Sequence, residues 1–266
     1  NPEDKDAMAS ISRAVIENGA DLGLIFDTDV DRVSAVDSNG NEISRNKIVG
    51  IAAALIAKEH PGTTIVTDSI TSDQLTVYLE KCLGLKHLRF KRGYKNVINK
   101  SIELNESGTD SQLAIETSGH AAYKENFFLD DGAYLATKIV IKLAKLHLMG
   151  EKIDVLLSGL EEPKEATEIR FKIDGSDFAS YADNVLEGFK FWAMDRENQG
   201  ISIVEPNYEG VRINFDLPEV KGWCLLRKSL HDPILPLNIE VTSGSCEIIL
   251  SMVSAFLSNY QRVIVK

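Results

Sequence analysis

The feature that most constrains the fold is a regular alternation of helical and strand patterns across residues 1–150. Apolar residues at helical spacing in 2–19 precede the continuous apolar run 20–27, which is typical of a strand covered on both faces. This order repeats along the chain, and it predicts an open, parallel or mixed sheet with helices on both faces. The expected helices are 2–19, 46–62, 72–84, 94–107 and 130–150, and the expected strands are 20–27, 63–68, 86–92 and 111–116.

The pattern changes near residue 161, where strand patterns separated by short turns, with two helices among them, replace the alternation. The expected strands lie within 161–175, 200–206, 210–217 and 222–229. The segment SGLEEPKE, residues 158–165, is the expected linker, and helices are expected at 178–194 and 245–264. The predicted fold class is therefore α/β, with a three-layer domain built on a mixed sheet and a C-terminal α+β domain.

Three carboxylates, Asp27, Asp29 and Asp31, follow the first predicted strand in the sequence DTDVDR. In an extended segment, residues two apart point the same way, so these like charges should crowd together and require a cation. Carboxylate oxygens without a nearby His or Cys favour a hard ion, and the set suits Mg²⁺ better than a full calcium cage. The alternative is a solvated acidic turn.

The net charge of −11 argues against a broad surface for nucleic acid or anionic membrane, because the long-range field would repel phosphates. An anionic ligand therefore needs a local basic cluster. One such cluster, which could equally be a solvated strand edge, surrounds Gly93 and consists of Arg89, Lys91, Arg92 and Lys95. The three widely spaced cysteines fit no disulfide framework, and the expected location is cytoplasmic.

Two further polar segments are candidates for binding a ligand. ETSGH, residues 116–120, offers a carboxylate, a hydroxyl and an imidazole, a set suited to sugar hydroxyls, although an ordinary turn is equally compatible with it. RKSLHDP, residues 227–233, places Arg227, Ser229 and His231 in a turn that could hold a phosphate. Like the aspartates, ETSGH follows a predicted strand, and ligands of open α/β sheets bind at the carboxyl ends of strands.

Taken together, these segments resemble the α-D-phosphohexomutase family, which includes phosphoglucomutases and phosphomannomutases. That family carries a metal loop DGDGDR, a sugar loop GExSGH and a late phosphate loop RxSGTEP in this order, and here they stand as DTDVDR, IETSGH and RKSLHDP. The resemblance implies interconversion of hexose 1-phosphate and hexose 6-phosphate through a phosphoserine enzyme and a bisphosphate intermediate. It does not distinguish between glucose, mannose and glucosamine phosphates.

The resemblance also implies a role for each matching residue. Asp27, Asp29 and Asp31 would hold Mg²⁺, with Arg32 beside the reacting phosphate. Lys95 would assist the reacting hydroxyl from the domain 3 loop. The substrate would be bound by Arg92, Gly93, Glu116, Ser118, His120, Arg227, Ser229 and His231.

Several departures from the family pattern affect these expectations. Thr28 and Val30 replace the two glycines of the metal loop, and β-branched residues are costly at positive φ, so ordinary backbone angles or a reshaped loop are expected. Leu230 and His231 replace Gly-Thr in the phosphate loop, and Ile115 replaces a glycine of the sugar loop.

The family's phosphoserine segment, T-x-S-H-N-P, does not occur in the sequence. We therefore expect a C-terminal fragment with the end of domain 2 at 1–43, domain 3 at 44–160 and domain 4 at 161–266. The expected partners are a hexose phosphate and the missing N-terminal domains, with no nucleic acid or membrane, and the fragment alone is expected to be inactive.

Two other classes remain open. A haloacid-dehalogenase-like phosphatase would use Asp27 as nucleophile, Asp29 as acid/base, and Asp130 and Asp131 as metal ligands. A non-catalytic module that binds sugar phosphate or a divalent cation would need no phosphoserine.

Overall fold

The computed structural model describes residues 2, 4–175, 177–229 and 232–265. The chain divides into two compact units, residues 1–161 and 162–266. No helix among the described residues is long and apolar enough to cross a membrane.

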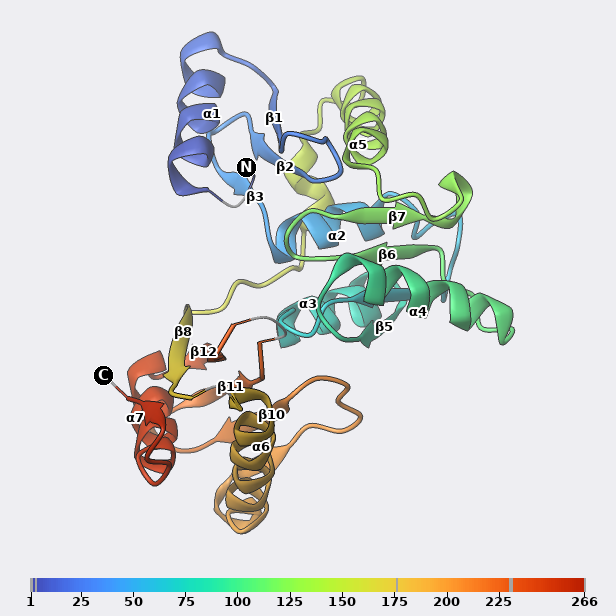
Figure 1. The fold of residues 1–266 in the computed structure, drawn as a ribbon. Coiled ribbons are helices and arrows are strands. Elements are labelled where there is room, and N and C mark those ends of the chain that lie inside the picture. The colour runs from blue at the N-terminus through green and yellow to red at the C-terminus, as the bar shows by residue number, and fades with distance from the viewer. Residues whose placement is uncertain (1, 3, 176, 230–231, 266) are drawn as a thin grey trace. The chain divides into compact units, whose positions relative to one another are not determined.

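The first unit begins with helix α1 (Lys5–Asn18) packed on a small sheet (Figure 1). The sheet has the order β1-β2-β3 and is antiparallel, whereas the sequence suggested a first strand in a parallel or mixed sheet. Asp4 caps the start of α1, and Gly19 ends it with a left-handed φ of 59°. The strands are β1 (Leu22–Phe26), β2 (Val33–Asp37) and β3 (Glu42–Ile43).

The expectation that the first apolar run is covered on both faces is wrong for β1 and describes its neighbour instead. β1 lies at an edge and is mostly half-buried, while every residue of β2 is buried. The sequence VSAVD of β2 mixes Ser and Asp with apolar residues, so its strand pattern is weak. Its burial comes from α1 on one face and from the main core of the unit on the other.

A second sheet of the first unit has the order β5-β4-β6-β7, with β4 parallel to both β5 and β6 and β7 antiparallel to β6 (Figure 1). Helix α4 covers one face, and α2, α3 and α5 contribute to the core on the other. This is the expected three-layer α/β arrangement with a mixed sheet. The elements are α2 (Asn46–Ala54), β4 (Thr64–Thr67), α3 (Asp73–Val77), η1 (Tyr78–Cys82), β5 (Lys86–Arg89), α4 (Tyr94–Glu106), β6 (Leu113–Ile115), β7 (Ala121–Tyr123), η2 (Lys124–Asn126), α5 (Gly132–His147) and η3 (Ile153–Leu157).

Two boundaries in this unit differ from the prediction. Helix α2 stops at Ala54 and the residues up to Pro61 form turns, although the apolar residues Leu55 and Ile56 continue the sequence pattern past the end of the helix. Strand β7 was not predicted, since its sequence AAY is too short to carry a periodic signal.

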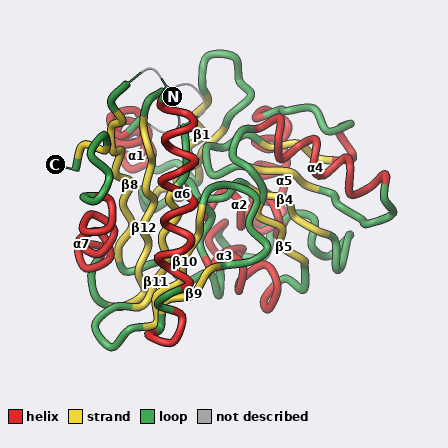
Figure 2. Tube along the Cα trace, turned by 60° about the horizontal axis from the view of Figure 1, so that its bottom comes forward, coloured by secondary structure: helices red, strands yellow, loops and turns green. Residues whose placement is uncertain are grey.

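The second unit is an antiparallel sheet of order β13-β8-β12-β11-β10-β9, and Figure 2 shows α6 lying over this sheet, roughly along its strands. Helices α6 and α7 pack with the sheet in one core. Its elements are β8 (Glu165–Ile173), α6 (Phe178–Met194), η4 (Glu197–Gln199), β9 (Ile201–Ile203), β10 (Val211–Asp216), β11 (Lys221–Leu226), β12 (Ile234–Ser243), α7 (Cys246–Leu257) and β13 (Val263–Ile264).

The predicted helix at 178–194 is confirmed, but β12 was missed and the last helix was drawn too long. Pro236 cannot donate a backbone hydrogen bond and lowers the expectation of a strand, yet its carbonyl accepts from Arg227 within the sheet. Helix α7 ends at Leu257, and Val263 pairs with Ile173 as part of β13.

Candidate functional site

Two loops of the first unit are joined through their backbones: residues 27–32 (DTDVDR), called the acidic loop below, and residues 116–120 (ETSGH). The amide of Val33 donates to the carbonyl of Gly119 at 3.3 Å, and Arg32 and His120 form an isolated antiparallel bridge. A Cβ on Gly119, at φ +98°, would lie 2.5 Å from the Val33 carbonyl oxygen. Gly119 is therefore needed for the close approach of the two loops.

Asp27, Asp29 and Asp31 each offer a carboxylate oxygen within 4.8 Å of the others. The segment is a turn rather than the extended stretch that the spacing argument assumed. The expectation of ordinary backbone angles is wrong for Val30, whose φ is 65°. A β-branched residue in this region stores strain of roughly 1–3 kcal/mol.

Arg32 holds Asp27 from two directions. Its Nε donates to Oδ2 at 2.5 Å and its backbone amide donates to Oδ1 at 3.2 Å. Burial raises the pKa of Asp27, but these hydrogen bonds and the positive charge of Arg32 outweigh it and hold the pKa below its ordinary value. Burial raises the pKa of Asp31, and neighbouring carboxylates add to this while His120 opposes it.

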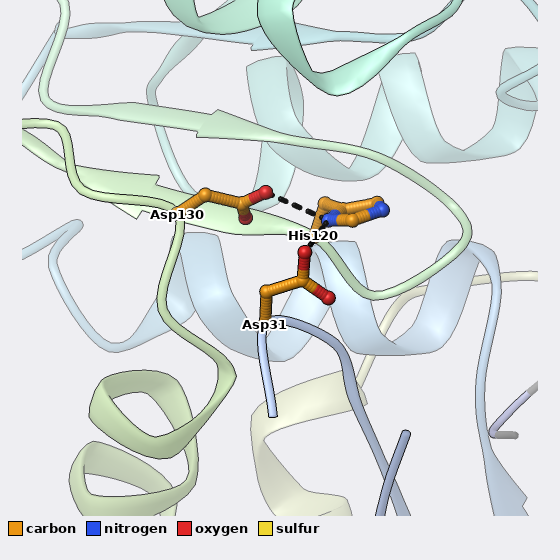
Figure 3. Close-up of side chains that lie close together, drawn as sticks. All are labelled: Asp31, His120 and Asp130. Carbon is orange, nitrogen blue, oxygen red and sulfur yellow. Dashed lines mark hydrogen bonds and ion pairs between the residues drawn. The ribbon is translucent and has the colours of Figure 1, made fainter. Parts of the chain in front are cut away.

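His120 lies between two carboxylates (Figure 3). Its Nδ1 is 2.8 Å from Oδ2 of Asp130, with which it forms a hydrogen bond, and 3.7 Å from Oδ2 of Asp31. Burial lowers the pKa of His120, but the bond to Asp130 and the nearby negative charges raise it above its ordinary value. The ring also stacks on Tyr94, with centroids 4.9 Å apart.

Glu116 is 4% exposed and connects the ETSGH loop to the loop around Gly93. The Gly93 amide donates to its Oε1 at 2.6 Å, and the Ser118 hydroxyl lies 3.5 Å from its Oε2. Burial, followed by the negative charge of Asp68, raises the pKa of Glu116 to about 7. Asp68 in turn accepts from both the amide and the hydroxyl of Thr117.

The basic cluster divides into residues with different surroundings. Arg89 donates to Asp73, Thr76 and backbone carbonyls, so it stabilises the loop after β4 rather than waiting for a ligand. Lys95 is exposed, with its Nζ 5.7 Å from the Tyr94 ring. Arg92 is half-buried, and its positive charge lowers the pKa of Glu116, against the larger effect of burial.

The remaining candidates belong to the second unit. Arg227 is buried just after β11, and its amide donates to Pro236. The Ser229 hydroxyl accepts from the amide of Asp232 at 3.2 Å. His231 lies outside the described residues.

Sequence reasoning gave no role at this site to Asp68, and it considered Asp130 only as a phosphatase metal ligand. Asp68 could have been found from its place at the end of the predicted strand 63–68, directly after the observed β4, in the same kind of position as the other polar clusters. Little in the sequence singles out Asp130. A carboxylate directly before a helix is expected as its N-cap, and the neighbouring Asp131 does cap α5.

The first unit has an α/β/α fold, and the loop of Glu116–His120 follows β6, which runs parallel to β4. In sheets of this kind, ligands bind at the carboxyl ends of the parallel strands. Residues 1–40 match the family model for phosphoglucomutase/phosphomannomutase alpha/beta/alpha domain II, and residues 44–161 match that for domain III. The chain belongs to the phosphoglucomutase/phosphomannomutase family, that of the α-D-phosphohexomutases.

Individual relatives agree with this family. A phosphomannomutase/phosphoglucomutase of Pseudomonas syringae pv. tomato is 29% identical over 90% of this chain and 47% of its own length. A phosphomannomutase of Methanocaldococcus jannaschii is 28% identical over 88% of this chain and 46% of its own length. The chain thus spans about half the length of the curated relatives it matches.

Solved structures share the fold. A phosphoglucomutase/phosphomannomutase family protein from Burkholderia thailandensis superposes with a TM-score of 0.76 at 23% identity. The match covers 97% of this chain and 51% of the other.

Proposed function

We propose that this chain forms the metal-binding and sugar-binding half of a phosphohexomutase. The intact enzyme interconverts hexose 1-phosphate and hexose 6-phosphate, of glucose or mannose, through a phosphoserine and a bisphosphate intermediate. The phosphoserine belongs to N-terminal domains of the same protein. The proposed parts are the end of domain 2 at 1–43, domain 3 at 44–160 and domain 4 at 161–266, in a cytoplasmic enzyme.

One observation carries this proposal: the bridge between Arg32 and His120. It joins the acidic loop to the loop of Glu116 and Ser118, so groups suited to a phosphate and to sugar hydroxyls lie next to each other. A mutase needs this adjacency, because the phosphoryl group moves to and from a hydroxyl of the bound sugar.

The donor set of Asp27, Asp29 and Asp31 fits Mg²⁺, since it consists of oxygens within 4.8 Å of one another. When bound, Mg²⁺ supplies positive charge that stabilises the transferring phosphoryl group. Arg32 holds Asp27 in place and lowers its pKa, which favours the ionised carboxylate at this one position of the set.

The other residues hold and orient the substrate. Glu116 and Ser118 accept and donate hydrogen bonds to sugar hydroxyls, and His120 completes that loop. Arg92 and the Gly93 amide position the sugar loop through Glu116. Lys95 is exposed and free to reach the reacting hydroxyl.

In domain 4, Arg227 and Ser229 bind the phosphate that does not react, and we assign His231 to the same loop. Arginine suits this role, because its planar fork can donate two hydrogen bonds to phosphate oxygens.

The contacts do not favour a haloacid-dehalogenase-like mechanism. Both oxygens of Asp27 accept from Arg32, which leaves this carboxylate poorly prepared to act as a nucleophile. Asp131 accepts from the amide of Tyr134 as the cap of α5, so it does not match the metal-ligand role of that alternative.

A coupled assay for conversion of glucose 1-phosphate to glucose 6-phosphate tests whether this chain binds the substrate while the N-terminal domains supply the phosphoserine. The chain alone should remain at background, and a protein extended by the N-terminal domains of its gene should turn over in the presence of Mg²⁺. Ser118→Ala in the extended protein should lower kcat/KM by about tenfold, the value of one hydrogen bond of about 1.4 kcal/mol. Robust turnover by the chain alone would place the phosphate carrier within these residues and contradict the proposal.

A further inference from the structure

A second cluster, which shares Asp31 with the aspartate triplet, contains a nitrogen ligand. It consists of Asp31, His120 and Asp130, whose candidate ligand atoms all lie within 4.8 Å of one another. Figure 3 shows the two carboxylates approaching the same ring nitrogen of His120, one from the acidic loop and one from the segment before α5. Three segments distant in sequence thus converge on one point.

The spacing suits a small transition-metal ion. Zn²⁺ binds His nitrogen and carboxylate oxygen at about 2.0–2.1 Å, so neighbouring ligands of a tetrahedral ion are roughly 3.3 Å apart. The observed distances from Nδ1 are 2.8 Å to Asp130 and 3.7 Å to Asp31, which lie on either side of that value. Shifts of about half an ångström in two side chains would therefore bring all three ligands into range.

The cluster also has unused ligand capacity. Oδ1 of Asp130 and Oδ1 of Asp31 are buried atoms that make no hydrogen bond within the described residues, although Oδ1 of Asp31 lies 3.9 Å from Nε of Arg32. The side chains of His120 and Asp130 are only 15% and 12% exposed, so water satisfies them poorly. Buried carboxylate oxygens of this kind are stabilised by a cation.

The chemistry of the donors separates this cluster from the aspartate triplet. Imidazole binds Zn²⁺ and related ions well, whereas Mg²⁺ prefers oxygen ligands and keeps several waters. The two carboxylates together can neutralise the charge of a divalent ion.

We propose that Asp31, His120 and Asp130 form a binding site for Zn²⁺ or a similar transition-metal ion, distinct from the triplet. The ion takes the place of the Nδ1 proton, which leaves to solvent, and open positions remain for water. Because Asp31 belongs to both sets, occupation of this site withdraws a ligand from the triplet. This antagonism with Mg²⁺ rests on the proposed function, whereas the Zn²⁺ site itself does not.

Isothermal calorimetry with ZnCl₂ tests the site, and the visible absorption of Co²⁺ tests the nitrogen ligand. Cys82→Ser serves as the parent, because Cys82 is an exposed thiol that could bind zinc independently. Outer-shell partners of a metal ligand are worth about 10–100-fold in affinity, so loss of a ligand should cost at least as much. His120→Gln and Asp130→Asn should therefore each weaken Zn²⁺ binding by about 100-fold.

Asp131→Asn is the matched control, because Asn retains the helix cap at the neighbouring position and should leave Zn²⁺ affinity within about twofold. Asp29→Asn tests location: it should weaken Mg²⁺ binding and spare Zn²⁺. Unchanged Zn²⁺ affinity in both His120→Gln and Asp130→Asn would overturn the site, and so would an equal loss in Asp29→Asn. If Zn²⁺ binds as expected but Mg²⁺ does not compete, the site stands and the metal role of the triplet fails.

Discussion

Replacing Glu116 with Gln should change how the stability of the first unit depends on pH. The pKa of Glu116 is raised from 4.5 to about 7, chiefly by burial and then by the charge of Asp68. A raised pKa means that the folded state prefers the protonated acid. The stabilisation is fully present below pH 4.5 and is lost as the pH rises through about 7.

The magnitude follows from the two pKa values. At about 1.36 kcal/mol per pH unit, a rise from 4.5 to about 7 gives an upper bound of about 3 kcal/mol. Gln mimics the neutral acid at every pH and keeps an oxygen for the Gly93 amide. The free energy of unfolding of Glu116→Gln should match that of the wild type near pH 4.5 and exceed it above pH 8 by about 1–3 kcal/mol.

Urea denaturation followed by far-ultraviolet circular dichroism at several pH values measures this difference. Trp192 and Trp223 both lie in the second unit, so their fluorescence reports on that unit as an internal control. The matched variant Glu103→Gln, on the exposed side of α4, should show no such trend. A stability gap between Glu116→Gln and wild type that is the same at pH 5 and pH 8 would refute the reasoning.

Val30→Gly should stabilise the first unit by about 1 kcal/mol, because relief of roughly 1–3 kcal/mol of strain exceeds the entropy cost of Gly, and thermal denaturation measures it. Thr28 does not have a positive φ, so Thr28→Gly should instead lower the free energy of unfolding by about 0.5–1 kcal/mol. Equal effects of the two substitutions would argue against strain at Val30. Gly119→Ala should cost about 2–4 kcal/mol, since its Cβ would lie 2.5 Å from a backbone oxygen of Val33, and a neutral result in urea titration would contradict that contact. Asp131→Ala should cost about 1 kcal/mol through the lost cap of α5, and an unchanged melting temperature would deny the cap a role.

The sequence predicted an element correctly where the apolar periodicity continued over the whole element and stopped at its ends. Helix α6 was predicted with its observed bounds, because its apolar positions repeat at helical spacing over 17 residues. Strand β12 was missed, because Pro236 argues against a strand and only pairing with β8 and β11 accounts for its ten residues. Burial of β2 likewise depends on tertiary packing that VSAVD does not encode locally.

The candidate site was predictable in its composition but not in its connections. DTDVDR and ETSGH were singled out because each follows a predicted strand, but β1 and β6 belong to different sheets, so this position does not by itself bring them together. The backbone bond between Val33 and Gly119, and the pairing of His120 with Asp130, depend on the tertiary approach of separate segments. Val30 shows the limit of local rules, because its left-handed φ opposes its own preference.

Titration of ¹⁵N-labelled protein with glucose 1-phosphate tests the central claim most directly, because it asks whether the loop of Glu116, Ser118 and His120 binds a sugar phosphate. The account predicts perturbations centred on residues 116–120 with affinity of about millimolar, near 4 kcal/mol, and weaker ones with glucose, which lacks the phosphate. Ser118→Ala should reduce the effect of both. Perturbations that fall elsewhere in the first unit, or none at about 50 mM ligand, which is far above a millimolar Kd, would contradict the account.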